Sequence, residues 1–150
     1  MREIKFRGLT TSFYQKPPEK EWVYGGLQMS YEGFTRIIPL DPAGPWDGVD
    51  PETVGQYTGL KDKNGVEIYE GDVLHISIEN RVISNYPQQD LTKTGVVKYS
   101  EENARFAIFT EGKTGDSFII CKDYELEVIG NVFDDPEFEK KFGEIYREAR

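Results

Sequence analysis

The amino-acid sequence predicts a mainly β protein that ends in one α-helix. Hydrophobic residues make up 37% of the 150 residues and aromatic residues 13%, and aromatic side chains suit the half-buried face of a pleated sheet. Several short runs alternate apolar and polar residues, and turn-forming residues separate them. Apolar residues recur with a helical period after residue 134. We therefore expect one mainly β domain over residues 1–133 and a helical extension over residues 134–150.

Three short strands are expected in the first third of the chain. Ile4 and Phe6 alternate with charged residues, which indicates the first strand. Gly25 and Gly26 are expected to stop the second strand, and Pro39 to end the third, because these residue types interrupt regular structure. The expected strands lie at residues 3–7, 22–24 and 34–38.

Residues 41–51 are expected to form no regular element. Three prolines and two glycines occur in this stretch, and proline removes a backbone donor while glycine weakens order. Trp46 lies here without a strand around it. Either this indole folds back into the core, or it is exposed and anchors a partner.

The alternation becomes sharper from residue 53 onward. Residues 53–60 and 66–69 predict a hairpin around Asn64 and Gly65, because Asn-Gly supplies the positive φ of a tight turn. A bulge or sharp bend is expected at Gly130 and Asn131. The later strands are expected at residues 73–78, 95–99, 105–110, 117–121 and 125–132.

A helix is expected close to the C-terminus. Asp135 is a natural N-cap residue, and Pro136 suits the first helical position. The apolar residues that follow form one stripe: Phe138, Phe142, Ile145 and Ala149. This stripe packs either on the sheet of its own chain or on that of a neighbouring copy.

Four phrases of the sequence together resemble the YopX family of phage and prophage proteins. They lie at residues 2–7, 22–25, 51–73 and 127–132, in the order that the family has. The resemblance implies an SH3-like small β-barrel, with its core over about residues 53–133 and additional N-terminal strands. It brings no established activity and no site residues. The helical tail departs from the commoner form of the family, in which many members end earlier.

The charge and the cysteine count limit the classes of partner. The chain carries 27 acidic and 18 basic residues, a net charge of −9, and it lacks the clustered basic residues that neutralise phosphates. Arg2, Lys5 and Arg7 form the one local group that could do so, and we expect no nucleic-acid partner. Cys121 is the single cysteine, which fits a reducing cytosol. With neither a signal peptide nor a long apolar run, we expect a cytoplasmic protein without a membrane partner.

Residues able to carry chemistry are few. His75 is the single histidine, and we expect it to be a half-exposed strand residue. Cys121 is expected to be a small buried thiol. Two such ligands do not make a tetrahedral zinc site, and the glycines do not form a phosphate-binding loop. We expect no catalytic residue, metal site or cofactor, and therefore a protein that is not an enzyme.

The aromatic residues are more informative. Core packing is expected for most of those in the first sixty residues, which include Trp22, Tyr24, Tyr31, Phe34 and Tyr57. The glycine-rich central phrase is explained either by hairpin geometry or by a binding surface. The candidate interaction surface consists of Trp46, Tyr57, Tyr69, Glu70, Phe138 and Phe142.

These observations favour a non-enzymatic module that binds another protein or assembles into a homo-oligomer. Three alternatives remain open at this point. The chain is a nucleic-acid-binding barrel, or an acidic mimic of DNA that inhibits a host enzyme, or an enzyme whose site has no recognisable pattern.

Overall fold

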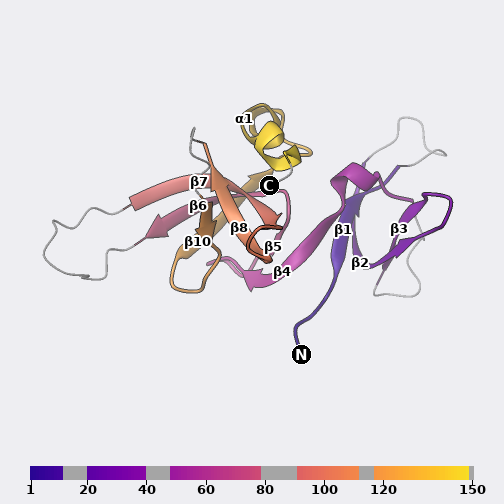
Figure 1. Cartoon of the computed structure of the whole chain (residues 1–150), viewed down its shortest axis with the longest axis horizontal. Helices are drawn as coiled ribbons and strands as arrows, with labels where there is room; N and C mark the ends of the chain where they lie inside the picture. The colour runs from indigo at the N-terminus through magenta and orange to yellow at the C-terminus, as the bar shows by residue number, and fades with distance from the viewer. Residues whose placement is uncertain (12–19, 40–47, 79–90, 112–116, 149–150) are drawn as a thin grey trace, which may run out of the picture. The chain divides into compact units, whose positions relative to one another are not determined.

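The computed structural model describes residues 1–11, 20–39, 48–78, 91–111 and 117–148 (Figure 1). The chain divides into two compact units, Met1–Gly59 and Leu60–Arg150. The strands form two antiparallel sheets, and one α-helix near the C-terminus is present among the described residues. The mainly β class and the C-terminal helix are thereby confirmed. The single domain expected over residues 1–133 stays a prediction.

The first unit is built on an antiparallel sheet with the strand order β3-β2-β1-β4. β4 continues past the boundary of the unit, and β5 follows it around a turn. The strand bounds are β1 Phe6–Leu9, β2 Trp22–Met29, β3 Thr35–Pro39, β4 Gly55–Lys61 and β5 Glu67–Tyr69.

The expected stop at Gly25 and Gly26 is wrong, because β2 runs through both glycines. Gly25 pairs with Phe6 on one side and with Pro39 on the other. A Cβ atom on Gly25 would collide with the carbonyl oxygen of Ile38. This glycine therefore permits the close approach of two strands and does not end one.

The expectation of no regular element over residues 41–51 is also wrong for the last residue of that stretch, Pro51. A 3₁₀ helix, η1, spans Pro51–Thr53 and is capped by the side chain of Asp50. Leu9 holds this helix against β1: its N–H donates to Thr53 Oγ1 at 2.9 Å, and its carbonyl accepts from the N–H of Asp50 at 2.9 Å. Trp46 lies outside the described residues.

The second unit contains a five-stranded antiparallel sheet with the order β10-β6-β7-β8-β9. β8 has the predicted bounds, whereas β7 begins four residues earlier than the pattern indicates. β10 shifts register between Val128 and Gly130, which confirms the predicted irregularity. The bounds are β6 Asp72–Ile78, β7 Leu91–Ser100, β8 Arg105–Thr110, β9 Ser117–Ile119, β10 Glu125–Asn131 and α1 Pro136–Arg147.

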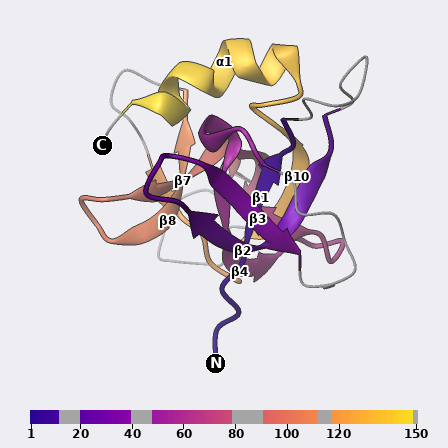
Figure 2. The same ribbon diagram turned by 90° about the vertical axis from the view of Figure 1, so that its right-hand side faces the viewer.

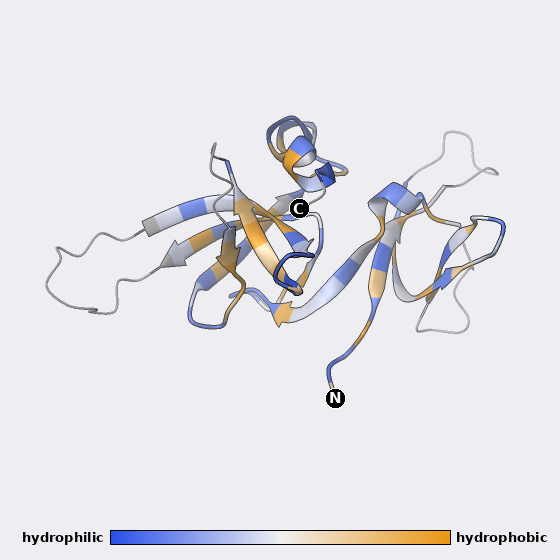
Figure 3. Cartoon of the chain, viewed as in Figure 1, coloured by the Kyte–Doolittle hydropathy of each residue, from blue (hydrophilic) through white to orange (hydrophobic). Residues whose placement is uncertain are grey.

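Apolar residues cover both faces of this second sheet, and β8 is hydrophobic along much of its length (Figure 3). One layer consists of Ile68, Leu74, Ile76, Val97, Ile108 and Leu126. The opposite layer consists of Val73, Val96, Ala107, Phe109, Val132 and Phe142. Since Phe142 belongs to α1, the helix packs on the sheet of its own chain. Burial of apolar area on both faces is the main source of stability in this unit.

Helix α1 begins as the sequence predicts. Asp135 Oδ1 accepts hydrogen bonds from the N–H groups of Glu137 and Phe138 at 3.0 and 3.3 Å. Pro136 occupies the first turn, where its missing N–H has no intrahelical partner to lose. No helix in the described part of the chain is both long and apolar enough to cross a membrane.

Gly65 and Gly71 provide a matched pair for testing the turns that flank β5. Both have positive φ, +81° and +84°. A Cβ atom on Gly71 would collide with the ring of Phe133, whereas a Cβ on Gly65 would have no atom within 4 Å. The two positions therefore share a backbone requirement and differ in packing.

We predict that Gly71→Ala lowers the free energy of unfolding more than Gly65→Ala. The positive φ costs about 1–2 kcal/mol at either position, and the displaced Phe133 ring adds about 1–3 kcal/mol at position 71 alone. Urea denaturation of the two variants and the wild type measures the difference. Equal losses would contradict the packing role of Gly71.

Candidate functional site

Three aromatic residues of the predicted interaction surface lie in the interior. Tyr57 is 5% exposed, Tyr69 2% and Phe142 0%. The Nζ atom of Lys5 lies 4.8 Å from the centroid of the Tyr57 ring, and the hydroxyl of Tyr69 donates to Glu67 Oε2 at 2.9 Å. These three rings therefore belong to the core.

Two further members of that predicted surface have structural partners. Glu70 Oε2 accepts a hydrogen bond from the N–H of Tyr99 at 3.2 Å and so links the turn before β6 to β7. The half-buried Phe138 lies against Gly130, where a Cβ atom would be 2.5 Å from the ring. The glycine therefore makes room for the first aromatic residue of the helix.

Two members of the local basic group, Lys5 and Arg7, lie over aromatic rings. Lys5 and Arg7 are 8% and 6% exposed. The guanidinium carbon of Arg7 lies 4.4 Å from the centroid of the Trp22 ring, and Lys5 forms an ion pair with Glu3 at 3.1 Å. Phosphate binding needs accessible cations, so this burial weighs against a nucleic-acid contact through Lys5 and Arg7.

The residues that could carry chemistry are placed in strands and near their ends. His75 lies in β6, in register with Glu127 and Thr94 on the neighbouring strands. Cys121 lies shortly after β9 and is half-buried, not buried as expected. In the ranges that the structure describes, no three His, Cys, Asp or Glu side chains form a group that could hold a metal ion.

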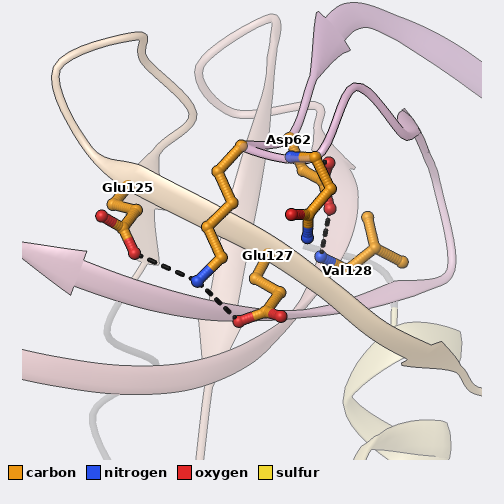
Figure 4. Close-up of polar contacts among 6 residues, drawn as sticks. Asp62, Glu125, Glu127 and Val128 are labelled. Atoms are coloured by element: carbon orange, nitrogen blue, oxygen red, sulfur yellow. Dashed lines mark hydrogen bonds and ion pairs between the residues drawn. The ribbon is translucent and has the colours of Figure 1, made fainter.

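Asp62 joins the turn after β4 to the edge of the second sheet. This residue is 7% exposed. Oδ1 accepts from the N–H groups of Asn64 at 2.8 Å and Val66 at 2.9 Å, which fixes the turn. Oδ2 accepts from the N–H of Val128 in β10 at 2.9 Å, and Figure 4 shows this contact. One side chain thus satisfies three backbone donors.

The protonation of Asp62 follows from these contacts. Burial by itself raises the pKa of this carboxyl group, but the backbone hydrogen bonds from Val128, Val66 and Asn64 outweigh it, so the pKa lies below its ordinary value. The carboxylate form is therefore the one that the fold selects.

The neighbouring Lys63 forms a second link to β10 (Figure 4). Its Nζ atom lies 3.0 Å from Glu127 Oε2 and 3.1 Å from Glu125 Oε1. These hydrogen bonds, the one to Glu127 first, raise the pKa of Lys63. Because the ammonium group is exposed and screened by water, the ion pairs add little stability.

Three large apolar side chains of the first unit are exposed at the turn between β2 and β3, two strands that Figure 2 labels. We call residues 29–34 the hairpin tip. The tip is closed by hydrogen bonds from the N–H of Ser30 to the carbonyl of Phe34 at 2.8 Å and from the N–H of Gly33 to the carbonyl of Ser30 at 3.1 Å. The hydroxyl of Ser30 also accepts from the N–H of Phe34 at 3.0 Å.

Three large side chains project from the tip. Met29 is 72% exposed, Tyr31 107% and Phe34 62%, and the exposed carboxylate of Glu32 lies between the two aromatic residues in the sequence. Core packing was expected for most of the early aromatic residues, and Tyr31 and Phe34 are exceptions to it. Ser30 and Gly33, spaced as the ends of a four-residue turn, were the signal that places Tyr31 at a corner.

Most of the chain matches a protein-family model. A family model described as YopX protein matches residues 18–138. The matched range includes the hairpin tip, the Asp62 turn and the start of α1. A search of curated proteins found no match.

We predict that Asp62→Asn lowers the free energy of unfolding by about 2 kcal/mol. The asparagine amide keeps one acceptor oxygen for the turn, but its NH₂ group then faces the N–H of Val128, so that hydrogen bond is lost. A hydrogen bond to a charged group is worth about 1.5–3 kcal/mol. Urea denaturation measures the loss. The control is Asp123→Asn, the same change at an exposed position, for which we expect a change within about 0.5 kcal/mol.

The stability advantage of the wild type over Asp62→Asn should also depend on pH. Since the pKa of Asp62 is lower in the folded than in the unfolded chain, its contribution is complete above the unfolded value of about 3.9 and is lost as pH falls through the folded value. Urea denaturation at neutral pH and at decreasing acidic pH measures the gap between the two proteins. A gap that does not change with pH would contradict the assignment.

Proposed function

The chain belongs to the YopX family, and from this premise we propose that it is a non-enzymatic module that binds another protein or assembles with itself. The observation that carries the proposal is the hairpin tip, where Met29, Tyr31 and Phe34 are largely exposed on a hydrogen-bonded turn. Single exposed apolar residues are ordinary. Three of them within six residues form a patch of the kind that marks interaction sites.

The order of the tip adds to the argument. Binding loses free energy when loops and side chains must be fixed. The hydrogen bonds around Ser30 already fix the backbone of the turn, and a tyrosine or phenylalanine has few rotatable bonds to lose. The tip can therefore bury a large apolar area at a small cost in conformational entropy.

The roles of the ionisable groups support the non-enzymatic part of the proposal. Asp62 is committed to three backbone donors, and Lys63 is paired with two glutamates. Lys5 and Arg7 lie over aromatic rings. Each of these groups already has a structural role, whereas catalytic groups converge on a substrate.

The proposal includes the fold type and the setting implied by the family resemblance. We infer an SH3-like barrel for about residues 53–133, a phage or prophage gene, and action in the cytosol of a bacterial host. The antiparallel pairing of β6, β7, β8 and β10 and the irregularity in β10 support the barrel, because bulges are common where small sheets bend.

The proposal predicts a defined complex of the full-length protein. Sedimentation velocity over increasing concentration measures self-association, and affinity purification of the tagged chain from its native cells, followed by mass measurement of the intact complex, measures binding to other proteins. We expect a complex of fixed stoichiometry in at least one of the two experiments. A chain that stays monomeric at every concentration and forms no stoichiometric complex would contradict the proposal.

A further inference from the structure

The composition of the hairpin tip limits what can bind there; this inference rests on the proposed function. The tip presents Met29, Tyr31 and Phe34 as apolar side chains and Glu32 as an exposed carboxylate. The exposed residues next to the tip are polar, Gln28 on β2 and Arg36 on β3, which form a cross-strand pair. An apolar centre with a polar rim is the usual anatomy of a protein–protein interface.

The area of the tip argues against a second copy as its occupant. An aromatic side chain buries about 150–250 Å², so three large side chains that are 72%, 107% and 62% exposed offer roughly 360–600 Å². A contact between two tips would then bury roughly 700–1,200 Å² in total, which at most reaches the lower end of the roughly 1,200–2,000 Å² of standard interfaces. A larger partner that surrounds the tip supplies the missing area.

The exposure and charge of the tip specify the receiving surface. Tyr31 is as exposed as in an extended chain, 107%, so its ring protrudes and needs a hollow to enter. Glu32 enters with the aromatic residues on either side, and an unpaired carboxylate is costly to remove from water. The net charge of −9 attracts a basic surface and is repelled by anionic lipid. The receiving surface must therefore combine an apolar hollow with cations.

We propose that the hairpin tip anchors this chain to a different protein through an apolar hollow with Lys or Arg side chains at its rim. Tyr31 and Phe34 fill the hollow, Met29 covers its edge, and Glu32 meets the rim. Aromatic residues centred in such a contact supply most of its binding energy.

The experiment uses the full chain with the photo-reactive residue p-benzoylphenylalanine at position 31, made in the cells that naturally contain the protein. The cross-linked protein is identified and purified, and its affinity for the uncross-linked wild type is measured by isothermal calorimetry. The cross-link identifies the partner. The test of the proposal is the affinity of the purified partner for the variants described next.

We expect the double variant Tyr31→Ser, Phe34→Ser to bind about 30-fold or more weakly, the effect of losing interface hot spots. Glu32→Lys should weaken binding about tenfold and reduce its dependence on salt, and Glu32→Gln should lie between it and the wild type. The control Ile119→Ser removes a 47% exposed apolar side chain in the second unit and should bind as the wild type does. Unchanged urea denaturation midpoints show that the variants fold.

Three results would overturn the proposal. The first is a cross-link from position 31 to another copy of the chain alone, and the second is no cross-link. The third is a purified partner that binds wild type and the Tyr31→Ser, Phe34→Ser variant equally; this result would leave the proposed function in place, because the partner would use another surface. A chain without any complex in sedimentation and purification would overturn the proposed function as well.

Discussion

The arrangement of the second unit depends on the carboxylate of Asp62. β10 is an edge strand that pairs with β6 on one side. Without a further partner, its other side would present unpaired backbone N–H groups. Asp62 accepts from the N–H of Val128 there, and the N–H of Lys63 donates to the carbonyl of Leu126 at 2.9 Å. The turn after β4 thus covers the edge of β10 and restricts pairing with other chains. Because the same carboxylate fixes its own turn, turn and edge are ordered together.

The two units use their aromatic residues differently. In the second unit, glycines make room for rings: Phe133 lies against Gly71 and Phe138 against Gly130, and α1 buries Phe142 on the sheet. The N-cap at Asp135 directs the helix from the end of β10 toward that layer. In the first unit, Tyr31 and Phe34 remain in water on a turn that hydrogen bonds hold in place. These rings of the second unit stabilise the fold, whereas Tyr31 and Phe34 of the first unit remain available for binding.

Local signals predicted the parts of the fold that depend on neighbouring residues. The cap at Asp135, the start of α1 at Pro136 and the bounds of β8 follow from patterns within a few positions. Long-range contacts decided the rest. Gly25 is needed because β3 passes close to β2, and Asp62 meets Val128, which is 66 positions away. The hydrophobic pattern predicted core packing for most of the early aromatic residues, but it did not show that Tyr31 and Phe34 are the ones exposed at a turn.

The titration of Asp62 tests the central role of this carboxylate most directly. NMR can follow the side-chain carboxyl carbon of Asp62 and the amide proton of Val128 together as the pH is lowered. The structure predicts that both signals change in one transition, with a pKa below the ordinary aspartate value of about 3.9, and that the Val128 amide is protected from exchange until that transition. A pKa at or above the ordinary value, or an amide of Val128 that does not respond to it, would contradict the account.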